Sequence, residues 1–166
     1  MLRGSGREEI TLMATAYINI GSNLGDRAAL IERAVAALEA ALGVVARRAP
    51  VVESPPWGFD SPNRFLNLGI AVETSLPPLE LLDLVRAVER DIDASPHRTP
   101  DGLYADRTID IDLIAVDDVV MESERLTLPH PRMHQRRFVL EPMARLAPAW
   151  RHPLSGLAAA EMLALL

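Results

Sequence analysis

The spacing of apolar residues along the chain predicts alternating strands and helices. Apolar side chains recur at every second position in residues 14–20, and at every third or fourth position after Asp26. A period of two is typical of a half-buried strand, and a period near 3.6 is typical of an amphipathic helix. Similar patterns predict further strands at 44–53, 64–73 and 106–118, and helices at 27–42, 79–92, 134–146 and 156–166.

Capping and turn residues set the boundaries of these elements. Asp26 can cap the first helix, which ends at Gly43, and a proline pair opens the second helix. Three prolines, a glycine and an asparagine predict a loop at 54–63, and 93–105 is a second long loop. We expect both loops to close over bound ligands.

The order of the predicted elements indicates the fold class. The order βαββαβ suggests an α+β, ferredoxin-like α/β sandwich, with one sheet and helices on one side. The segments after residue 118 would form a small helical and extended appendage. We expect one domain over residues 14–166, preceded at 1–13 by a disordered extension or an alternative start.

The composition limits the chemistry that the chain can carry. It has no cysteine and all 17 basic residues are arginine, which excludes thiolate metal sites, a Schiff-base lysine and a P-loop lysine. The net charge of −6 argues against a general nucleic-acid binder. No apolar run approaches the length of a membrane span, and we expect a cytoplasmic monomer.

Two acidic residues interrupt an otherwise apolar strand. Asp110 and Asp112 point to one side of the predicted strand 106–118, roughly 7 Å apart, on a face that continues through Ile114 and Val116. Two carboxylates on a partly covered face repel each other and lose hydration. One of them should therefore take up a proton unless a cation compensates.

Two explanations for this carboxylate pair are open. Mg²⁺ fits because it typically takes one or two carboxylates and fills its other positions with water and phosphate oxygens. Alternatively, the aspartates flank a sheet edge and pair with arginines such as Arg107. The spacing of the carboxylates alone does not decide between these explanations.

Basic and aromatic residues near the strand favour a ligand that carries phosphates and a flat ring. One guanidinium group can bind two phosphate oxygens at once, which favours a phosphate ligand. The alternative is that these arginines only form a solvated surface. The basic residues are Arg125, His130, Arg132, His134, Arg136 and Arg137. Aromatic rings in loops either stack on something planar or cover the core. These rings are Trp57, Phe59, Phe65, Tyr104 and Phe138.

Four segments together resemble a known enzyme family. AYINIGSNLGD, ESPPWGFDSPNRFLN, DRTIDIDLI and RLTLPHPRMHQRRFVLEP occur in the order and approximate spacing of 6-hydroxymethyl-7,8-dihydropterin pyrophosphokinases, over about residues 16–153. The resemblance implies a ferredoxin-like fold. It also implies a transferase that moves the pyrophosphoryl group of ATP onto the hydroxymethyl group of a reduced pterin, releasing AMP, in tetrahydrofolate biosynthesis.

The resemblance further implies roles for individual residues. Asp110 and Asp112 would hold two Mg²⁺ ions that bridge the triphosphate, and Arg107 and Arg98 would join them as catalytic residues. The pterin would contact Ser54, Pro55, Trp57, Phe65, Asn67 and Phe138, with the two phenylalanines sandwiching the ring and the asparagine reading its edge. The nucleotide would contact Arg86, Glu89, Tyr104, Arg107, Leu113, Arg125, Thr127, His130 and Arg136.

The chain departs from the family pattern just before the aspartates. The usual tryptophan-glycine-proline-arginine reads Tyr-Ala-Asp-Arg at 104–107, and the loop before it is longer and offers only His97 and Arg98. Tyr104 can still cover the site as the tryptophan would. No base for the hydroxyl proton is obvious from the sequence, and Asp112, placed by a metal, is the candidate.

Two rival functions remain open from the sequence. A ferredoxin-like domain that senses a nucleotide or metabolite without catalysis would not need paired carboxylates at the centre of a strand. A different metal-dependent nucleotidyltransferase would use the same Asp-x-Asp chemistry. AMP release from ATP, only in the presence of the hydroxymethyl pterin, separates all three functions.

Overall fold

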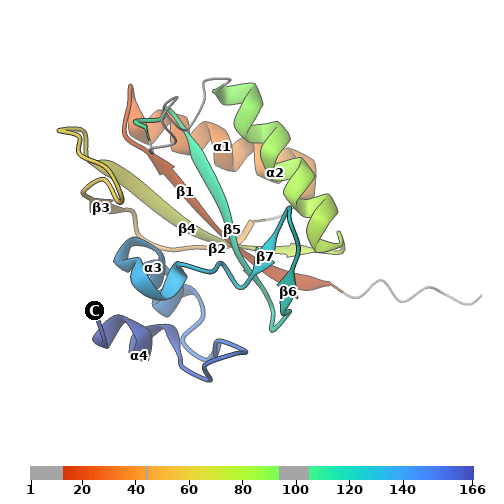
Figure 1. Cartoon of the computed structure of the whole chain (residues 1–166). Coiled ribbons are helices and arrows are strands. Elements are labelled where there is room, and N and C mark those ends of the chain that lie inside the picture. Colours follow the sequence, from red (N-terminus) through yellow and green to blue (C-terminus); the bar gives the residue numbers. More distant parts are fainter. Residues whose placement is uncertain (1–12, 44, 94–104) are drawn as a thin grey trace, which may run out of the picture.

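The computed structural model of the chain describes residues 13–43, 45–93 and 105–166 (Figure 1). The predicted extension at 1–13 lies outside these residues except for Met13, and so do His97, Arg98 and Tyr104. No helix in the described part of the chain is long and apolar enough to cross a membrane.

An antiparallel sheet forms the centre of the molecule. In the described residues it has five strands, with β2, β4, β1 and β5 in this order and β3 also paired to β4. The strands are β1 (Ala14–Ser22), β2 (Val45–Arg48), β3 (Val52–Ser54), β4 (Phe65–Thr74) and β5 (Asp110–Val116). Strand β1 pairs with β4 on one side and with β5 on the other.

The predicted strand 44–53 is two strands, not one. Both pieces pair with β4, β2 opposite residues 70–72 and β3 opposite residues 65–67. Pro50 lies between them and has no backbone N–H to donate to a sheet ladder. Both pieces run antiparallel along the same edge of β4, and the second piece brings Ser54 opposite Phe65.

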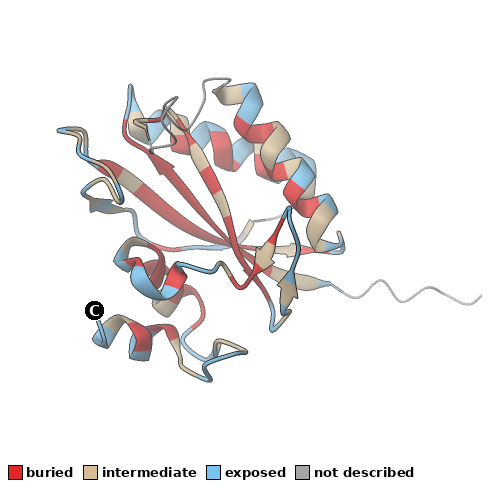
Figure 2. Ribbon diagram, in the orientation of Figure 1, coloured by how far each residue is buried: buried red, intermediate tan, exposed pale blue. Residues whose placement is uncertain are grey.

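Two long helices cover one face of the sheet. They are α1 (Arg27–Leu42) and α2 (Pro78–Ile92), and they lie side by side in Figure 1. The predicted cap is confirmed, since Asp26 Oδ1 accepts a hydrogen bond from Ala29 N at 3.2 Å. Figure 2 shows that the helix sides facing the sheet are buried. The core between helices and strands includes Ile18, Ile20, Leu38, Leu68, Ile70, Leu81 and Ile111.

The C-terminal segment, the expected appendage, covers the opposite face of the sheet, whereas both helices of the βαββαβ core lie on one side as expected. It contains the 3-10 turn η1 (Met133–Gln135), α3 (Arg137–Leu146) and α4 (Ala159–Ala164). These elements bury Tyr17, Ala71 and Ile114 in a second core. At Gly69 of β4, a Cβ atom would lie 2.5 Å from Pro142 Cβ, so only glycine lets α3 approach this closely.

A bulge in β5 changes one predicted side-chain direction. The β1–β5 register shifts between Tyr17 and Ile18, so that Ile114 and Ala115 both pack with α3. Val116 consequently lies with Ile111 and Leu113 on the α1–α2 face, and not with the aspartates as expected. A short hairpin follows, β6 (Met121–Glu122) and β7 (Thr127–Leu128), and His130 N donates to Ile114 O at 2.7 Å.

Candidate active site

Asp110 and Asp112 project from the edge strand β5 beside a large cavity. In the register with β1 they lie opposite Gly21 and Asn19, on the face that α3 covers further along. The prediction that both carboxylates share one face is therefore confirmed. The cavity that they line has a volume of about 550 Å³.

Each aspartate faces an arginine. Arg107 Nη1 lies 3.0 Å from Asp110 Oδ2, and Arg136 Nη1 lies 3.9 Å from Asp112 Oδ2. The pairing with Arg107 that the sequence left open is thus present. Burial raises the pKa of the Asp112 carboxyl and Glu89 adds to this, while Arg136, Arg86 and Arg107 oppose it.

All six positions assigned to the pterin line the larger cavity. They are Ser54, Pro55, Trp57, Phe65, Asn67 and Phe138. Asn67 Nδ2 donates to Ser54 Oγ at 2.8 Å and to Val52 O at 3.3 Å, which fixes the carboxamide between β3 and β4. A Cβ at Gly21 would lie 3.3 Å from Asn67 Oδ1, so glycine at this position keeps room beside the amide.

Arg136 lies among the aromatic rings of this cavity. Its Cζ atom is 4.3 Å from the centroid of the Trp57 ring and 5.7 Å from that of Phe138. The side chain is buried, and its Nε makes no hydrogen bond to any described residue. A buried guanidinium with an unused donor is suited to an anionic oxygen supplied by a ligand.

A second cavity of about 210 Å³ continues beyond Asp112. Five of the nucleotide positions line it, namely Arg86, Leu113, Arg125, Thr127 and His130. Arg86, Asp112, His130 and Pro131 line both cavities, so one extended ligand, or two ligands that meet, can occupy the joined space. Arg107, Arg136 and Glu89 line the larger cavity only, and Tyr104 and Arg98 lie outside the described residues.

Glu89 supports the strand between the two aspartates. Its Oε2 accepts a hydrogen bond from Ile111 N at 2.8 Å, and Arg86 Nη1 donates to Ile111 O at 3.0 Å. Arg86 Nη1 also lies 3.2 Å from Glu89 Oε2. Because β5 is the last strand of the sheet, its outer backbone groups need such partners. This pair thus holds Asp110 and Asp112 in place.

His130 is held in its neutral form. Burial is the main reason that its pKa falls to about 4, and Arg136 lowers it further. His130 Nδ1 accepts a hydrogen bond from Arg132 N at 3.1 Å, so the ring proton resides on Nε2. A neutral imidazole with one N–H donor is suited to a phosphate or ribose oxygen.

Some members of the cavity wall were missed by sequence reasoning. They are Asn19, Gly21 and Pro131, whereas Phe59 and Arg132, which the sequence had singled out as an aromatic and a basic candidate, also line this cavity. Asn19 is buried, and its Oδ1 makes no hydrogen bond to a described residue. In the sequence, a polar residue between Ile18 and Ile20 indicates a side chain on the other face of the strand. Only the register with β5 shows that Asn19 lies opposite Asp112. Of the basic cluster, His134 and Arg137 are exposed and line neither cavity.

Comparisons with known proteins identify the family of this chain. Residues 17–148 match the family described as 7,8-dihydro-6-hydroxymethylpterin-pyrophosphokinase (HPPK). The chain is 39% identical over 142 residues to the 2-amino-4-hydroxy-6-hydroxymethyldihydropteridine pyrophosphokinase of Porphyromonas gingivalis, covering 85% of this chain and 95% of the relative. It is 38% identical over 132 residues to the enzyme of that name from Bacillus subtilis, covering 79% and 77%.

A solved structure has a similar fold. The crystal structure of wild-type Plasmodium falciparum HPPK-DHPS matches with a TM-score of 0.71 at 14% identity. The match covers 93% of this chain and 45% of that chain, so this chain spans less than half of the solved one.

Proposed function

The chain belongs to the 7,8-dihydro-6-hydroxymethylpterin-pyrophosphokinase family, and we propose that its two joined cavities are the pterin and nucleotide sites of that activity. The enzyme transfers the pyrophosphoryl group of ATP to the hydroxymethyl group of 6-hydroxymethyl-7,8-dihydropterin and releases AMP, a step of folate biosynthesis. The alternative of a sensing domain without catalysis is not supported.

The pterin occupies the larger cavity in this proposal. Its ring stacks between Phe65 and Phe138, and its amide edge meets the carboxamide of Asn67. The hydrogen bonds from Asn67 to Ser54 and Val52 support this, because they fix the amide before the ligand arrives. Trp57 covers the ring from the loop between β3 and β4, with Arg136 beside it.

ATP enters through the smaller cavity, with its triphosphate at the junction near Asp112. The arginines and the neutral imidazole that line this junction support the assignment, since guanidinium groups suit phosphate oxygens. Arg125 reaches the outer end of the smaller cavity, where it also pairs with Asp83. In this arrangement the β-phosphorus lies toward the pterin hydroxymethyl group.

The carboxylate pair fits magnesium that arrives with ATP. No group of three or more histidine, aspartate or glutamate residues in the described residues can hold a metal alone. Asp110 and Asp112 thus offer two ligands, and phosphate oxygens and water supply the rest, which is the usual coordination of Mg²⁺. Two such ions, when bound, would neutralise charge on the triphosphate.

The reaction forms a bond between the hydroxymethyl oxygen and the β-phosphorus while the bond from that phosphorus to the α-phosphate oxygen breaks. AMP leaves with this oxygen, and the hydroxyl proton passes to the solvent. The residues of the chain contribute mainly position and positive charge, which is what phosphoryl-type transfer requires. Arg107 and Arg136 meet the phosphates, and Glu89 with Arg86 keeps the aspartate strand in register.

The same proposal covers the organisation of the chain. We propose a ferredoxin-like core, which the order β2-β4-β1-β5 with α1 and α2 on one face supports, and a single domain over residues 14–166. We also propose that the protein works as a monomer in the cytoplasm.

One observation carries the proposal: Asp112 lies where a cavity lined with aromatic rings meets one lined with basic side chains. The test is AMP release from ATP with magnesium, measured with 6-hydroxymethyl-7,8-dihydropterin and with the 6-methyl analogue. We expect AMP only with the hydroxymethyl compound, since the analogue has no attacking oxygen. Equal AMP release without any pterin would contradict the proposal.

A further inference from the structure

The carboxylate of Asp106 joins three segments that border the active site. Its Oδ1 accepts a hydrogen bond from Asn23 Nδ2 at 2.7 Å, and its Oδ2 accepts one from Asn63 Nδ2 at 2.9 Å. The Ser61 side chain also hydrogen-bonds to it. Asn23 precedes α1, while Ser61 and Asn63 belong to the loop between β3 and β4. One side chain therefore connects loops that lie 83 and 43 residues away along the chain.

Asn23 extends this connection to the backbone of Arg107. Asn23 Oδ1 accepts a hydrogen bond from Arg107 N at 2.7 Å, and Asn23 N donates to Arg107 O at 3.1 Å. The Asn23 amide has one correct orientation, because its Nδ2 must face Asp106 and its Oδ1 must face Arg107 N. Asp106 therefore fixes the amide that holds Arg107.

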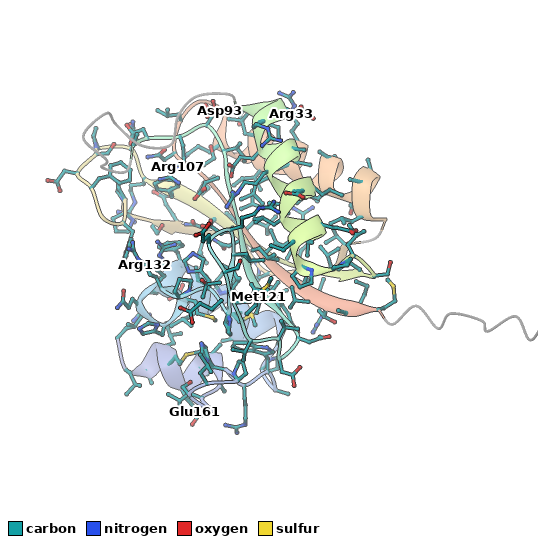
Figure 3. All side chains as sticks on the ribbon, turned by 45° about the vertical axis from the view of Figure 1, so that its right-hand side comes forward. Arg33, Asp93, Arg107, Met121, Arg132 and Glu161 are labelled. Carbon is teal, nitrogen blue, oxygen red and sulfur yellow. The ribbon has the colours of Figure 1, made fainter. Side chains whose placement is uncertain are left out.

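The backbone of Arg107 in turn sets the place of its guanidinium. Nη1 lies 3.0 Å from Asp110 Oδ2, and Nε donates to Ala105 O at 3.3 Å. Arg107, labelled in Figure 3, is 8% exposed although it carries a full charge. A buried guanidinium held at its backbone and at Nε is kept in the cavity wall beside Asp110, where a phosphate oxygen can reach it.

We propose that Asp106 is a positioning residue for pyrophosphoryl transfer, which ties the loop before α1 and the β3–β4 loop to Arg107. The proposal rests on the proposed role of Arg107 at the triphosphate. Proline, which the family pattern has at this position, offers no side-chain acceptor. The connection therefore depends on the aspartate that stands at position 106 of this chain.

The groups around Asp106 are suited to a carboxylate. Burial raises the pKa of the Asp106 carboxyl, but the hydrogen bonds from Ser61, Asn23 and Asn63 together hold it below its usual value. Asparagine at 106 would keep one acceptor oxygen and turn the other into a donor. Asp106→Asn should therefore keep part of the connection, and Asp106→Ala should lose all of it.

A double-mutant cycle on AMP release tests the proposal. The variants are Asp106→Ala, Asp106→Asn, Arg107→Met and the double variant Asp106→Ala with Arg107→Met. Glu32→Ala is the control, because Glu32 is a hydrogen-bonded carboxylate, paired with Arg48, that lines neither cavity.

We expect Asp106→Ala to lower kcat/KM on the order of 100-fold, as a misplacement of about 1 Å can do, and Asp106→Asn to lower it less. In the Arg107→Met background, Asp106→Ala should cost no more than about twofold, because residues that act as a unit are not additive. Glu32→Ala should behave as the original enzyme.

Exchange of the Arg107 backbone N–H, followed by NMR, reports on the connection without any substrate. Asp106→Ala should speed this exchange at least about tenfold, since local opening becomes easier, and Glu32→Ala should not. The proposal would be overturned if Asp106→Ala changed neither the exchange rate nor kcat/KM. It would also be overturned if Asp106→Ala lowered kcat/KM as much in the Arg107→Met background as in the original enzyme. If the original enzyme released no AMP with the pterin, the proposed function would fail, while the exchange result would still test the connection.

Discussion

Arg107 Nη1 lies 3.0 Å from Asp110 Oδ2, three residues further along the chain. Asp112 faces Arg136 at 3.9 Å, so both carboxylates have a cationic neighbour before any substrate binds. A divalent cation that binds these aspartates must compete with the guanidiniums. The triphosphate offers the same guanidiniums new partners, so ATP and magnesium should bind together far better than magnesium alone.

Removing either carboxylate tests this arrangement. Asp110→Ala or Asp112→Ala should lower AMP release at least about 1,000-fold, because the charge stabilisation that a bound metal provides is worth several kcal/mol. Both variants should also bind ATP more weakly in the presence of magnesium, measured by calorimetry, and should keep the circular dichroism spectrum of the fold.

The matched control is Asp118→Ala. Asp118 is an exposed carboxylate just beyond the C-terminal end of β5, and it lines neither cavity. This variant should turn over and bind as the original enzyme. Normal activity in either Asp110→Ala or Asp112→Ala would show that the metal assignment is wrong.

Asn67→Ala should separate pterin binding from ATP binding. The carboxamide is anchored by Ser54 and Val52 and lines the larger cavity only. Its loss removes hydrogen bonds to the pterin edge, which should weaken pterin binding roughly tenfold or more, since such a bond is worth about 1–2 kcal/mol. ATP binding should change little. Calorimetry with each ligand alone gives the answer, and weaker ATP binding with unchanged pterin binding would reverse the assignment of the cavities.

Sequence periodicity predicted the elements well and their packing only in part. It placed Asp110 and Asp112 on one face, because a strand alternates side chains and two charges among apolar residues are conspicuous. It failed at Val116, because a bulge adds one residue to the strand and a valine suits either face equally well. An apolar stripe likewise shows that α3 is buried, but not against which side of the sheet.

The site was predicted mainly through the family resemblance, and its missed members have a physical explanation. Asn19 and Gly21 lie in β1, nearly a hundred residues before the aspartates that they face. Their relevance depends on strand register, which a single sequence does not state. The connection through Asp106 was invisible for the same reason, since Asn23, Asn63 and Asp106 meet only when three loops converge.

The two tryptophans of the chain offer a spectroscopic test of the larger cavity. Trp57 lines this cavity, with Arg136 Cζ at 4.3 Å from its ring centroid. Trp150 packs elsewhere, where its Nε1 donates to Asp117 O at 2.8 Å and its ring meets Tyr17. Pterin should change the emission of Trp57 by altering its surroundings. The Trp57→Phe variant should lose this change in emission, and Trp150→Phe should keep it. The opposite result would show that the pterin does not bind in the larger cavity.

His130 makes the stability of the ligand-free protein depend on pH. The pKa of its imidazole falls from 6.5 to about 4 in the folded chain, mainly through burial, with Arg136, Arg132 and Arg86 adding to the shift and Asp110 opposing it. Between these two values the unfolded chain binds a proton that the folded chain does not. The free energy of unfolding should therefore have its full value above pH 6.5 and should decrease as the pH drops toward 4.

Urea unfolding across this pH range measures the effect. Protonation of His130 should lower the free energy of unfolding by about 3 kcal/mol at most. This decrease should be absent in His130→Gln, whose side chain does not titrate. His134→Gln is the matched control, because the exposed His134 imidazole stands in water whether or not the chain is folded. This variant should keep the pH slope of the original protein. If His130→Gln kept that slope too, the acid sensitivity would come from the carboxyl groups, and the burial of His130 would not cause it.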